Sequence, residues 1–465
     1  MTTLAATRRP PLAPLAPRRA PPDAPEPNGF GFGLFILVNA ILFVRPADVV
    51  PAFINIEFYQ YAILACLLVS FPAVLDHLQP AKMEKRPIDL CVIGLFFATV
   101  LSHAASARLD RMVDEGFASF KVVVYYLLFV ALVTTPARLR TFSAWIALFA
   151  CAVAALSALD YHKVIRLPRA LSEFGVYAIE DEERMYGPGI FQDPNDVGLL
   201  IVAAAMLLLG RLSDSKAGSL RVLWLLPLSM FGYAFYLTRS RGAMLALLAG
   251  LGTLALLRWG WRVALLLALL VAPLGLAVLS GRNLDLKSHQ DTGQTRIQLW
   301  NAAMVHFRAN PVFGVGTREF HRQPEVKHVA HSSYMQAFVE TGFVGGMLFV
   351  GAILFSAAGL LSMRNPVTRQ GRVIPRRILD PVMDQQFPFV AAAVVAFAAG
   401  MLTLTLNYLV VTYAFFGMAS MVLATARTDP ERAPPRFDLG TWGKLAGVSL
   451  LFLVGMFGFI RLFLA

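Results

Sequence analysis

The sequence predicts an all-α polytopic membrane protein, with about 12–13 transmembrane helices and a large extracytoplasmic loop that contains short amphipathic helices. Two features of the composition exclude an ordinary water-soluble globule: 57% of the 465 residues are apolar and 15% are charged. The third observation is a series of apolar stretches close to the length that crosses a bilayer as a helix. These candidate spans are roughly 30–45, 58–76, 88–104, 117–134, 141–159, 190–210, 222–238, 243–258, 262–280, 343–362, 388–406, 408–426 and 443–462.

Arginine and lysine residues set the expected orientation, because they concentrate in cytoplasmic loops. With residues 1–29 inside, alternate loops hold most of the basic residues. The short loops of the other side hold only Arg45, Arg108, Arg111, Arg239 and Arg241. Loops 160–189 and 281–342 are then extracytoplasmic. The net charge of +12 is mainly this orientation signal, and we see no nucleic-acid footprint in it.

The chain divides into four predicted parts. Residues 1–29 carry eight prolines and four arginines without an apolar period, which is typical of a disordered cytoplasmic tail. Residues 30–280 form an N-terminal transmembrane bundle, residues 281–342 an extracytoplasmic active-site loop, and residues 343–465 the C-terminal transmembrane helices.

The first half of the 281–342 loop has the pattern of an amphipathic helix. Asp291 or Thr292 can cap its start, and proline in Asn310-Pro311 ends it before two glycines that permit a reversal. Apolar residues recur at helical spacing at Ile297, Trp300, Met304 and Phe307. Arg296 falls on the edge of that stripe. We expect this helix to lie along the membrane surface, with Arg296 near the lipid headgroups.

The second half of the loop leads into the bilayer. Residues 343–362 contain no charge, so His331 and Glu340 are expected at or above the membrane boundary. Nine residues separate the two, which places them on opposite sides of a straight helix. Direct pairing of His331 with Glu340 is therefore not expected.

Other outer loops hold charged residues with two interpretations each. Asp193-Pro194-Asn195 is a turn that can cap the following helix, and Arg184 stands at the outer mouth of that span. Arg239 and Arg241 either extend to the headgroups or form an anion site, and we favour the anion site. The carboxylates of loop 105–116 are interleaved with arginines, so a solvated charged loop is favoured over a metal site.

The predicted topology brings Arg241, Arg296 and His331 to one membrane boundary, together with Arg184 and Arg239. Guanidinium groups bind phosphate oxygens with two parallel hydrogen bonds and stay charged. Histidine accepts a proton near neutral pH. These residue types suit a phosphorylated lipid and a nucleophile that must lose a proton.

Five motifs in order resemble the O-antigen ligase and O-antigen polymerase superfamily. They are Phe191-x-Asp193-Pro194-Asn195, Ser240-Arg241-Gly242-Ala243, Arg296-x-x-Leu299-Trp300, Asn310-Pro311-Val312-Phe313-Gly314-Val315-Gly316, and His331-x(8)-Glu340-x-Gly342-x-x-Gly345. Ligases of this superfamily commonly have asparagine after the histidine, where this chain has Ser332. That form, with the early Arg45-Pro46, resembles the O-glycosylation ligases of exosortase-associated loci.

The resemblance implies transfer of a glycan from an undecaprenyl-diphosphate carrier to a hydroxyl acceptor on a lipid, glycan or protein. The reaction would take place at the outer face of the bacterial inner membrane, without metal, cofactor or ATP. Arg241 and Arg296 would hold the diphosphate, His331 would activate the acceptor, and Glu340 would have a structural role. A polymerase of the same superfamily is the alternative enzyme. A lipid-linked-glycan transporter or flippase is less favoured, because the apolar spans hold almost no charge at mid-depth.

Overall fold

The computed structural model describes residues 28–46, 53, 56–167, 184–279, 292–326, 328–369, 372–431 and 438–464. The longer helices of this part are α1 (Gly29–Val44), α3 (Phe58–His77), α5 (Pro87–Ala105), α6 (Leu109–Leu132), α7 (Pro136–Tyr161), α8 (Pro194–Leu212), α9 (Leu225–Thr238), α10 (Arg241–Trp259), α11 (Trp261–Leu279), α12 (Thr292–Ala309), α13 (Ser333–Leu361), α14 (Pro381–Gly400), α15 (Val410–Thr425) and α16 (Leu439–Phe463). Short helical segments are α4 (Pro80–Met83), η2 (Ser215–Trp224), η3 (Phe320–Arg322) and η4 (Ser362–Arg364). All but the last two residues of the predicted 1–29 tail, and residues 281–291 of the predicted active-site loop, lie outside the described residues.

The predicted all-α membrane fold is confirmed. In the described part of the chain, ten helices are long and apolar enough to cross a membrane. Three further apolar helices are shorter, namely α1, the first part of α11 and α15. Each of the thirteen predicted apolar stretches therefore corresponds to a helix.

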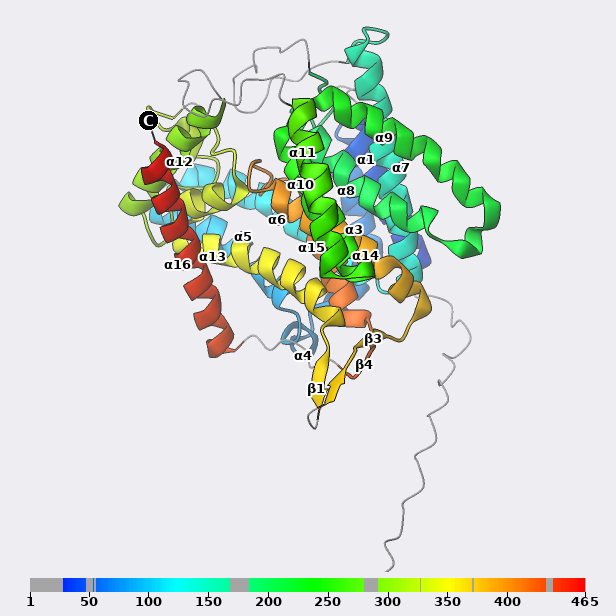
Figure 1. The fold of residues 1–465 in the computed structure, drawn as a ribbon. Helices are drawn as coiled ribbons and strands as arrows, with labels where there is room; N and C mark the ends of the chain where they lie inside the picture. The colour runs from blue at the N-terminus through cyan, green and yellow to red at the C-terminus, as the bar shows by residue number, and fades with distance from the viewer. Residues whose placement is uncertain are drawn as a thin grey trace, which may run out of the picture.

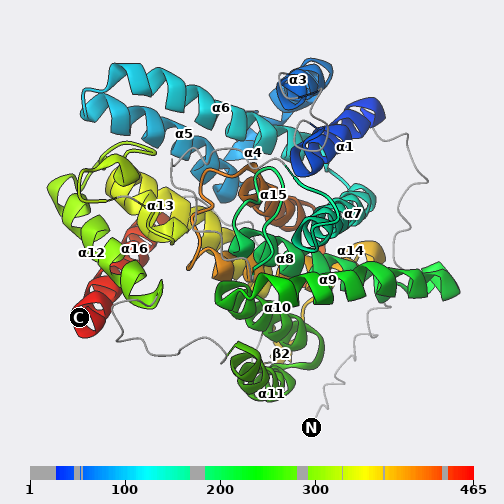
Figure 2. The ribbon, with the colours of Figure 1, turned by 90° about the horizontal axis from the view of Figure 1, so that it is seen from above.

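Two helices form the centre of the bundle (Figure 2). In α8 and α14, 67% of the most apolar 18-residue window is buried inside the protein, whereas the corresponding share in α3 and α16 is 22%. Helix α8 packs against α7, α10 and α14, and α5 packs against α6 and α13. Because α3 and α16 bury so little against protein, their leucine-rich faces are suited to contact with lipid.

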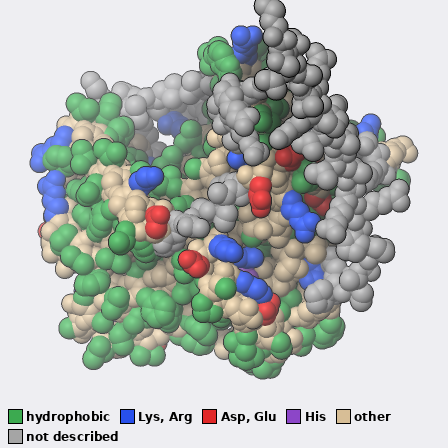
Figure 3. Space-filling view, turned by 90° about the horizontal axis from the view of Figure 1, so that it is seen from below, with side chains coloured by type: hydrophobic (Ala, Val, Ile, Leu, Met, Phe, Trp, Pro, Cys, Tyr) green, Lys and Arg blue, Asp and Glu red, His purple; other side chains and the backbone are tan. Residues whose placement is uncertain are grey.

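The two ends of the bundle differ (Figure 1). Helix α12 lies at one end. At the other end lie α4 and a small antiparallel hairpin of β1 (Val367–Arg369) and β2 (Arg372–Ile374), with Val367 opposite Ile374. A second short antiparallel pair joins β3 (Arg377–Ile378) to β4 (Thr428–Asp429). Seen from below, this end carries basic and acidic side chains among hydrophobic ones (Figure 3).

Helix α13 is interrupted near its start. It begins at Ser333, ten residues before the predicted apolar span, and Gly342 breaks it with φ 64° and ψ −165°. The turn after α12 fills the break through four backbone hydrogen bonds. They run from Val315 N to Val339 O, Gly316 N to Glu340 O, Phe343 N to Pro311 O, and Val344 N to Val312 O, at 3.0, 3.0, 2.7 and 3.3 Å.

Glycine is required where the turn meets the break. A Cβ atom on Gly314, whose φ is 75°, would lie 2.4 Å from the carbonyl group of Glu340. A Cβ atom on Gly342 would lie 2.2 Å from the carbonyl oxygen of Val312. Both positions also need a positive φ, so side chains there are excluded by clash and by backbone strain. The turn and the first part of α13 are therefore fixed to each other.

Segment 105–116 was interpreted as a solvated charged loop: Asp110 and Asp114 are exposed, as expected, but the segment is not a loop. Helix α6 already begins at Leu109, so most of this segment is helical. Its charged residues also have protein partners: Arg108 forms an ion pair with Glu319, and Glu115 lies 3.6 Å from Arg318. These ion pairs connect the start of α6 to the loop between α12 and α13.

Candidate functional site

The site begins where α8 starts. Asp193 caps this helix, as the Asp-Pro-Asn sequence predicts, and its carboxylate accepts hydrogen bonds from the backbone and the side-chain amide of Asn195, both at 2.7 Å. The side-chain oxygen of Asn195 accepts hydrogen bonds from Arg184 at 3.0 Å and from the Ser240 hydroxyl at 2.7 Å. Asn195 thus joins three segments that are distant in the sequence.

The start of α10 lies beside the start of α8. Ser240 caps α10 by accepting a hydrogen bond from Ala243 N, which places Arg241 as the first residue of the helix. A Cβ atom on Gly242 would lie 2.4 Å from the Thr403 hydroxyl, so the chain here needs glycine for close packing. Arg239 ends α9 in a left-handed conformation with φ 48°. The short loop is therefore a rigid corner that presents two arginines.

Arg296 reaches this corner from α12. The predicted helix is confirmed: α12 spans Thr292–Ala309 and buries Ile297 and Met304. Burial lowers the pKa of the Arg296 guanidinium, Asp193 opposes this effect, and the positive charges of Arg184 and Arg241 add to it. These influences place Arg296 within electrostatic range of both arginines and of Asp193.

His331 faces the same group of charges. Burial and the nearby charge of Arg296 lower the pKa of its imidazole to about 4, against a smaller opposite effect of Asp193. Its ring is therefore neutral at neutral pH. The backbone of His331 has φ 47°, which is the left-handed region that non-glycine residues rarely adopt. Such a conformation persists where the surrounding contacts impose it.

The residues on both sides of His331 supply those contacts. The Ala330 N–H donates to the side-chain oxygen of Gln336 at 2.7 Å, and the Trp300 ring N–H donates to the Ala330 carbonyl at 2.8 Å. On the other side, the Ser333 hydroxyl donates to Leu404 O at 2.6 Å. His331 is consequently held between α12, α13 and the segment after α14.

Glu340 is connected to His331 indirectly. Its buried carboxylate accepts hydrogen bonds from the Gln336 amide at 2.7 Å and from the Tyr408 hydroxyl. Gln336 also donates to Tyr408 at 3.1 Å. The connection from Glu340 to His331 therefore runs through Gln336 and Ala330, which agrees with the expectation that the two do not pair directly.

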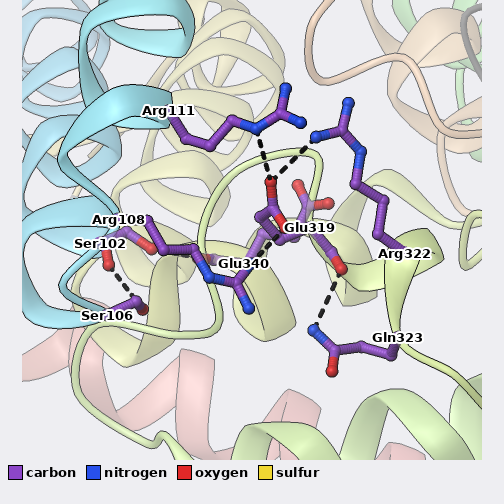
Figure 4. Close-up of polar contacts among 8 residues, drawn as sticks. All are labelled: Ser102, Ser106, Arg108, Arg111, Glu319, Arg322, Gln323 and Glu340. Atoms are coloured by element: carbon purple, nitrogen blue, oxygen red, sulfur yellow. Dashed lines mark hydrogen bonds and ion pairs between the residues drawn. The ribbon is translucent and has the colours of Figure 1, made fainter.

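A second ion-pair cluster anchors the loop between α12 and α13 (Figure 4). Glu319 pairs with Arg108, with Arg322 at 3.2 Å and with Arg111 at 3.9 Å. Arg318 pairs with Glu115 and stacks over the Tyr408 ring, 5.3 Å from its centroid. These contacts tie the loop to α6 and to the tyrosine that binds Glu340.

The assembled site is basic, with one neutral imidazole. Electrostatic effects link Arg296 with Arg184, Arg241, Asp193 and His331, and a hydrogen bond joins Arg184 to Asn195. Arg239 lies two residues before Arg241, at the end of α9. Among the described residues, no group of three or more His, Cys, Asp or Glu side chains could hold a metal ion. Such a site suits a doubly charged anion and a group that must give up a proton.

Gln336, Tyr408 and the Trp300 hydrogen bond were not predicted. A weak signal was present for Gln336, because it precedes Glu340 by four residues and side chains at that spacing meet on a helix. Tyr408 gave no such signal, since it reaches Glu340 from a turn 68 residues further along the chain.

Comparison with known families gives one match. Residues 225–350 match the family model described as O-Antigen ligase, which confirms the resemblance seen in the motifs. The matched range contains Arg241, Arg296, His331 and Glu340, whereas Arg184 precedes it. No curated protein sequence matches the chain.

Proposed function

We propose that this membrane protein is a glycosyltransferase of the O-antigen ligase type, on the basis of the match of residues 225–350 to the family model described as O-Antigen ligase. It moves a glycan from an undecaprenyl-diphosphate carrier to an acceptor hydroxyl. The observation that carries the proposal is the position of Arg296, which lies within electrostatic range of Arg184, Arg241, Asp193 and His331.

The arginines hold the diphosphate of the donor. Arg296 lies near the positive charges of Arg184 and Arg241, and the carboxylate of Asp193 opposes them, so the corner has a positive charge that an anionic ligand compensates. Arg241 and Arg296 grip the diphosphate, while Arg184 and Arg239 support it from the ends of neighbouring segments. As the bond to the sugar breaks, negative charge grows on the leaving diphosphate, and fixed guanidinium groups stabilise that charge without rearranging.

His331 is the base. The acceptor oxygen bonds to the anomeric carbon of the sugar, and the bond from that carbon to the diphosphate oxygen breaks. The hydroxyl proton passes to the imidazole of His331, and undecaprenyl diphosphate leaves with the electron pair. Because the ring is neutral in the free protein, a nitrogen lone pair is ready to accept this proton. Binding of the anionic donor raises the basicity of the ring by offsetting the charge of Arg296.

The reaction face is the outer surface of the bacterial inner membrane. Two features support this face: the basic loops follow the positive-inside rule, and α12 lies at the end of the bundle opposite the arginine-bearing β1–β2 hairpin (Figure 1). The acceptor is a lipid, glycan or protein hydroxyl. The exosortase-associated O-glycosylation form of the enzyme remains part of this proposal, on the basis of Ser332.

Two other functions are distinguishable by their products. A polymerase of the same superfamily adds the glycan to another lipid-linked glycan, so it yields a ladder of lengths. A transporter breaks no bond and releases no undecaprenyl diphosphate. We favour the transferase because the selected charged residues gather at one end of the bundle, around a neutral histidine.

The test uses purified protein, an undecaprenyl-diphosphate oligosaccharide and mass spectrometry of released undecaprenyl diphosphate and glycosylated product. We expect His331→Ala to lower the transfer rate by about 10²–10⁴, the usual contribution of positioned base catalysis. His162→Ala is the control, because His162 pairs with Tyr233 at the end of α7, outside the arginine group. Transfer by His331→Ala at the rate of the unmodified protein would remove the base assignment.

A further inference from the structure

A cavity of about 500 Å³ lies at the end of α13 that is opposite to His331. It opens between the start of α5 and the last turns of α13 and α15. We propose that this cavity binds one anionic phospholipid from the cytoplasmic leaflet. The inference concerns a separate site and does not depend on the transferase proposal.

The mouth of the cavity is basic. Every charged residue that lines it carries a positive charge: Lys82, Lys85 and Arg86. Lys85 is exposed, Lys82 is half-exposed and lies 2.6 Å from Asp76, and Arg86 lies 3.8 Å from the buried Asp89. Three cations within five residues give a phosphate group several donors in one place.

The walls of the cavity are mainly apolar. Ile88 from α5, Leu354 and Phe355 from α13 and Leu423 from α15 line it below the basic mouth. At Gly359, a Cβ atom would lie 2.8 Å from the Leu423 side chain, so α13 and α15 approach closely there. The apolar residues of α13 and α15 therefore form adjoining walls of the cavity.

The separation of charge identifies the class of ligand. The cations come from one short segment, residues 82–86, and the remaining lining is apolar apart from the Ser362 and Ser420 hydroxyls. A soluble phosphate compound would leave the apolar walls without a matching surface. An amphiphile with an anionic headgroup and acyl chains fits both parts, and basic pockets between helices at the cytoplasmic side are known to bind such headgroups.

The location agrees with that ligand. Lys82, Lys85 and Arg86 follow α3 in a loop that the positive-inside rule assigns to the cytoplasm. This loop lies at the end of the bundle that also carries the β hairpin (Figure 1). Anionic lipids and their negative surface potential are concentrated in the cytoplasmic leaflet.

Native mass spectrometry of the full-length protein in detergent tests the proposal, with dioleoyl phosphatidylglycerol as the probe. We expect one bound lipid per chain. The variant Lys82→Gln/Lys85→Gln should weaken binding about thirtyfold, because each lysine beside an anionic headgroup contributes on the order of fivefold. Ala358→Trp, an exposed wall position, should also weaken binding by filling the groove. Lys444→Gln, at an exposed position outside the cavity, should bind as the unmodified protein does.

Three results would overturn the proposal. One is binding of phosphatidylglycerol with unchanged affinity by both cavity variants, and another is equal affinity for dioleoyl phosphatidylcholine, which lacks net charge. The third is displacement of the lipid by millimolar inorganic phosphate, which would show that the cations bind phosphate without the acyl groove. Thermal unfolding of each variant, measured without added lipid, confirms that the compared proteins are folded.

Discussion

Replacement of Gln336 by methionine tests how His331 is held. The two side chains have similar length, but methionine removes three hydrogen bonds: from Ala330 N–H at 2.7 Å, to Glu340 at 2.7 Å and to Tyr408 at 3.1 Å. The change leaves the buried Ala330 N–H without an acceptor, which costs about 1–3 kcal/mol. If that energy is lost from the positioning of His331 in the transition state, the transfer rate falls by roughly 5- to 150-fold.

The assay measures transfer at several donor concentrations, so that kcat and KM separate. Gln336 contacts the backbone before His331 and no arginine of the corner, so kcat should fall while the KM for the lipid-linked donor changes little. Gln323→Met is the matched control, because the Gln323 side chain donates to the Glu319 carbonyl in the anchoring loop. We expect it to leave kcat unchanged.

A double variant decides whether Gln336 acts through His331. In a His331→Ala protein the imidazole is gone, so adding Gln336→Met should slow the residual transfer little further. An equal loss of rate from Gln336→Met in both backgrounds would refute the positioning role. The loss of rate would then come from lower stability or from a change at the donor site.

Three further predictions address charge, pH and topology. Arg241→Lys and Arg296→Lys keep the positive charge but lose the two-pronged donor, so each should slow transfer about tenfold to a hundredfold. The control Arg45→Lys should not slow transfer, and equal rates in all three variants would exclude a diphosphate clamp. Burial lowers the pKa of His331 to about 4, so the neutral base persists below pH 6.5. The acid limb of the kcat/KM profile should therefore lie below that of an ordinary histidine. An acid limb above pH 6.5 would contradict a base held neutral by its surroundings. A reporter inserted in 318–328 should be extracytoplasmic and one in the β1–β2 hairpin cytoplasmic, and the reverse result would remove the assignment of the site to the outer face.

Much of the fold follows from local patterns. The apolar stretches predicted the thirteen apolar helices, and Ile297, Met304 and Asn310-Pro311 predicted the face and the end of α12 because spacing and proline act locally. The break in α13 was not predicted. Gly342 lies beside an apolar run that reads as continuous helix, and the hydrogen bonds that stabilise its conformation come from a turn about 30 residues earlier.

In the candidate site, too, the features carried by local sequence were predicted and those that depend on tertiary contacts were not. Arginine and histidine could be selected from residue type and loop position, since the chemistry of each is carried by its own side chain. The partners that orient them are tertiary contacts. Nothing near Tyr408 in the sequence indicates that its hydroxyl meets Glu340, and nothing in the β1–β2 segment distinguishes strands from a basic loop.

The turn inserted into α13 bears on how this protein is made. In hydrocarbon, each unpaired backbone N–H or carbonyl costs several kcal/mol, so a helix with an open break is a poor candidate for insertion by itself. The four groups exposed at Gly342 are paired by residues 311–316, which are synthesised before the break. We therefore expect α12, the turn 311–316 and the start of α13 to assemble together during biosynthesis. An insertion within 311–316 would harm membrane integration of α13 itself, well before any catalytic defect could be observed.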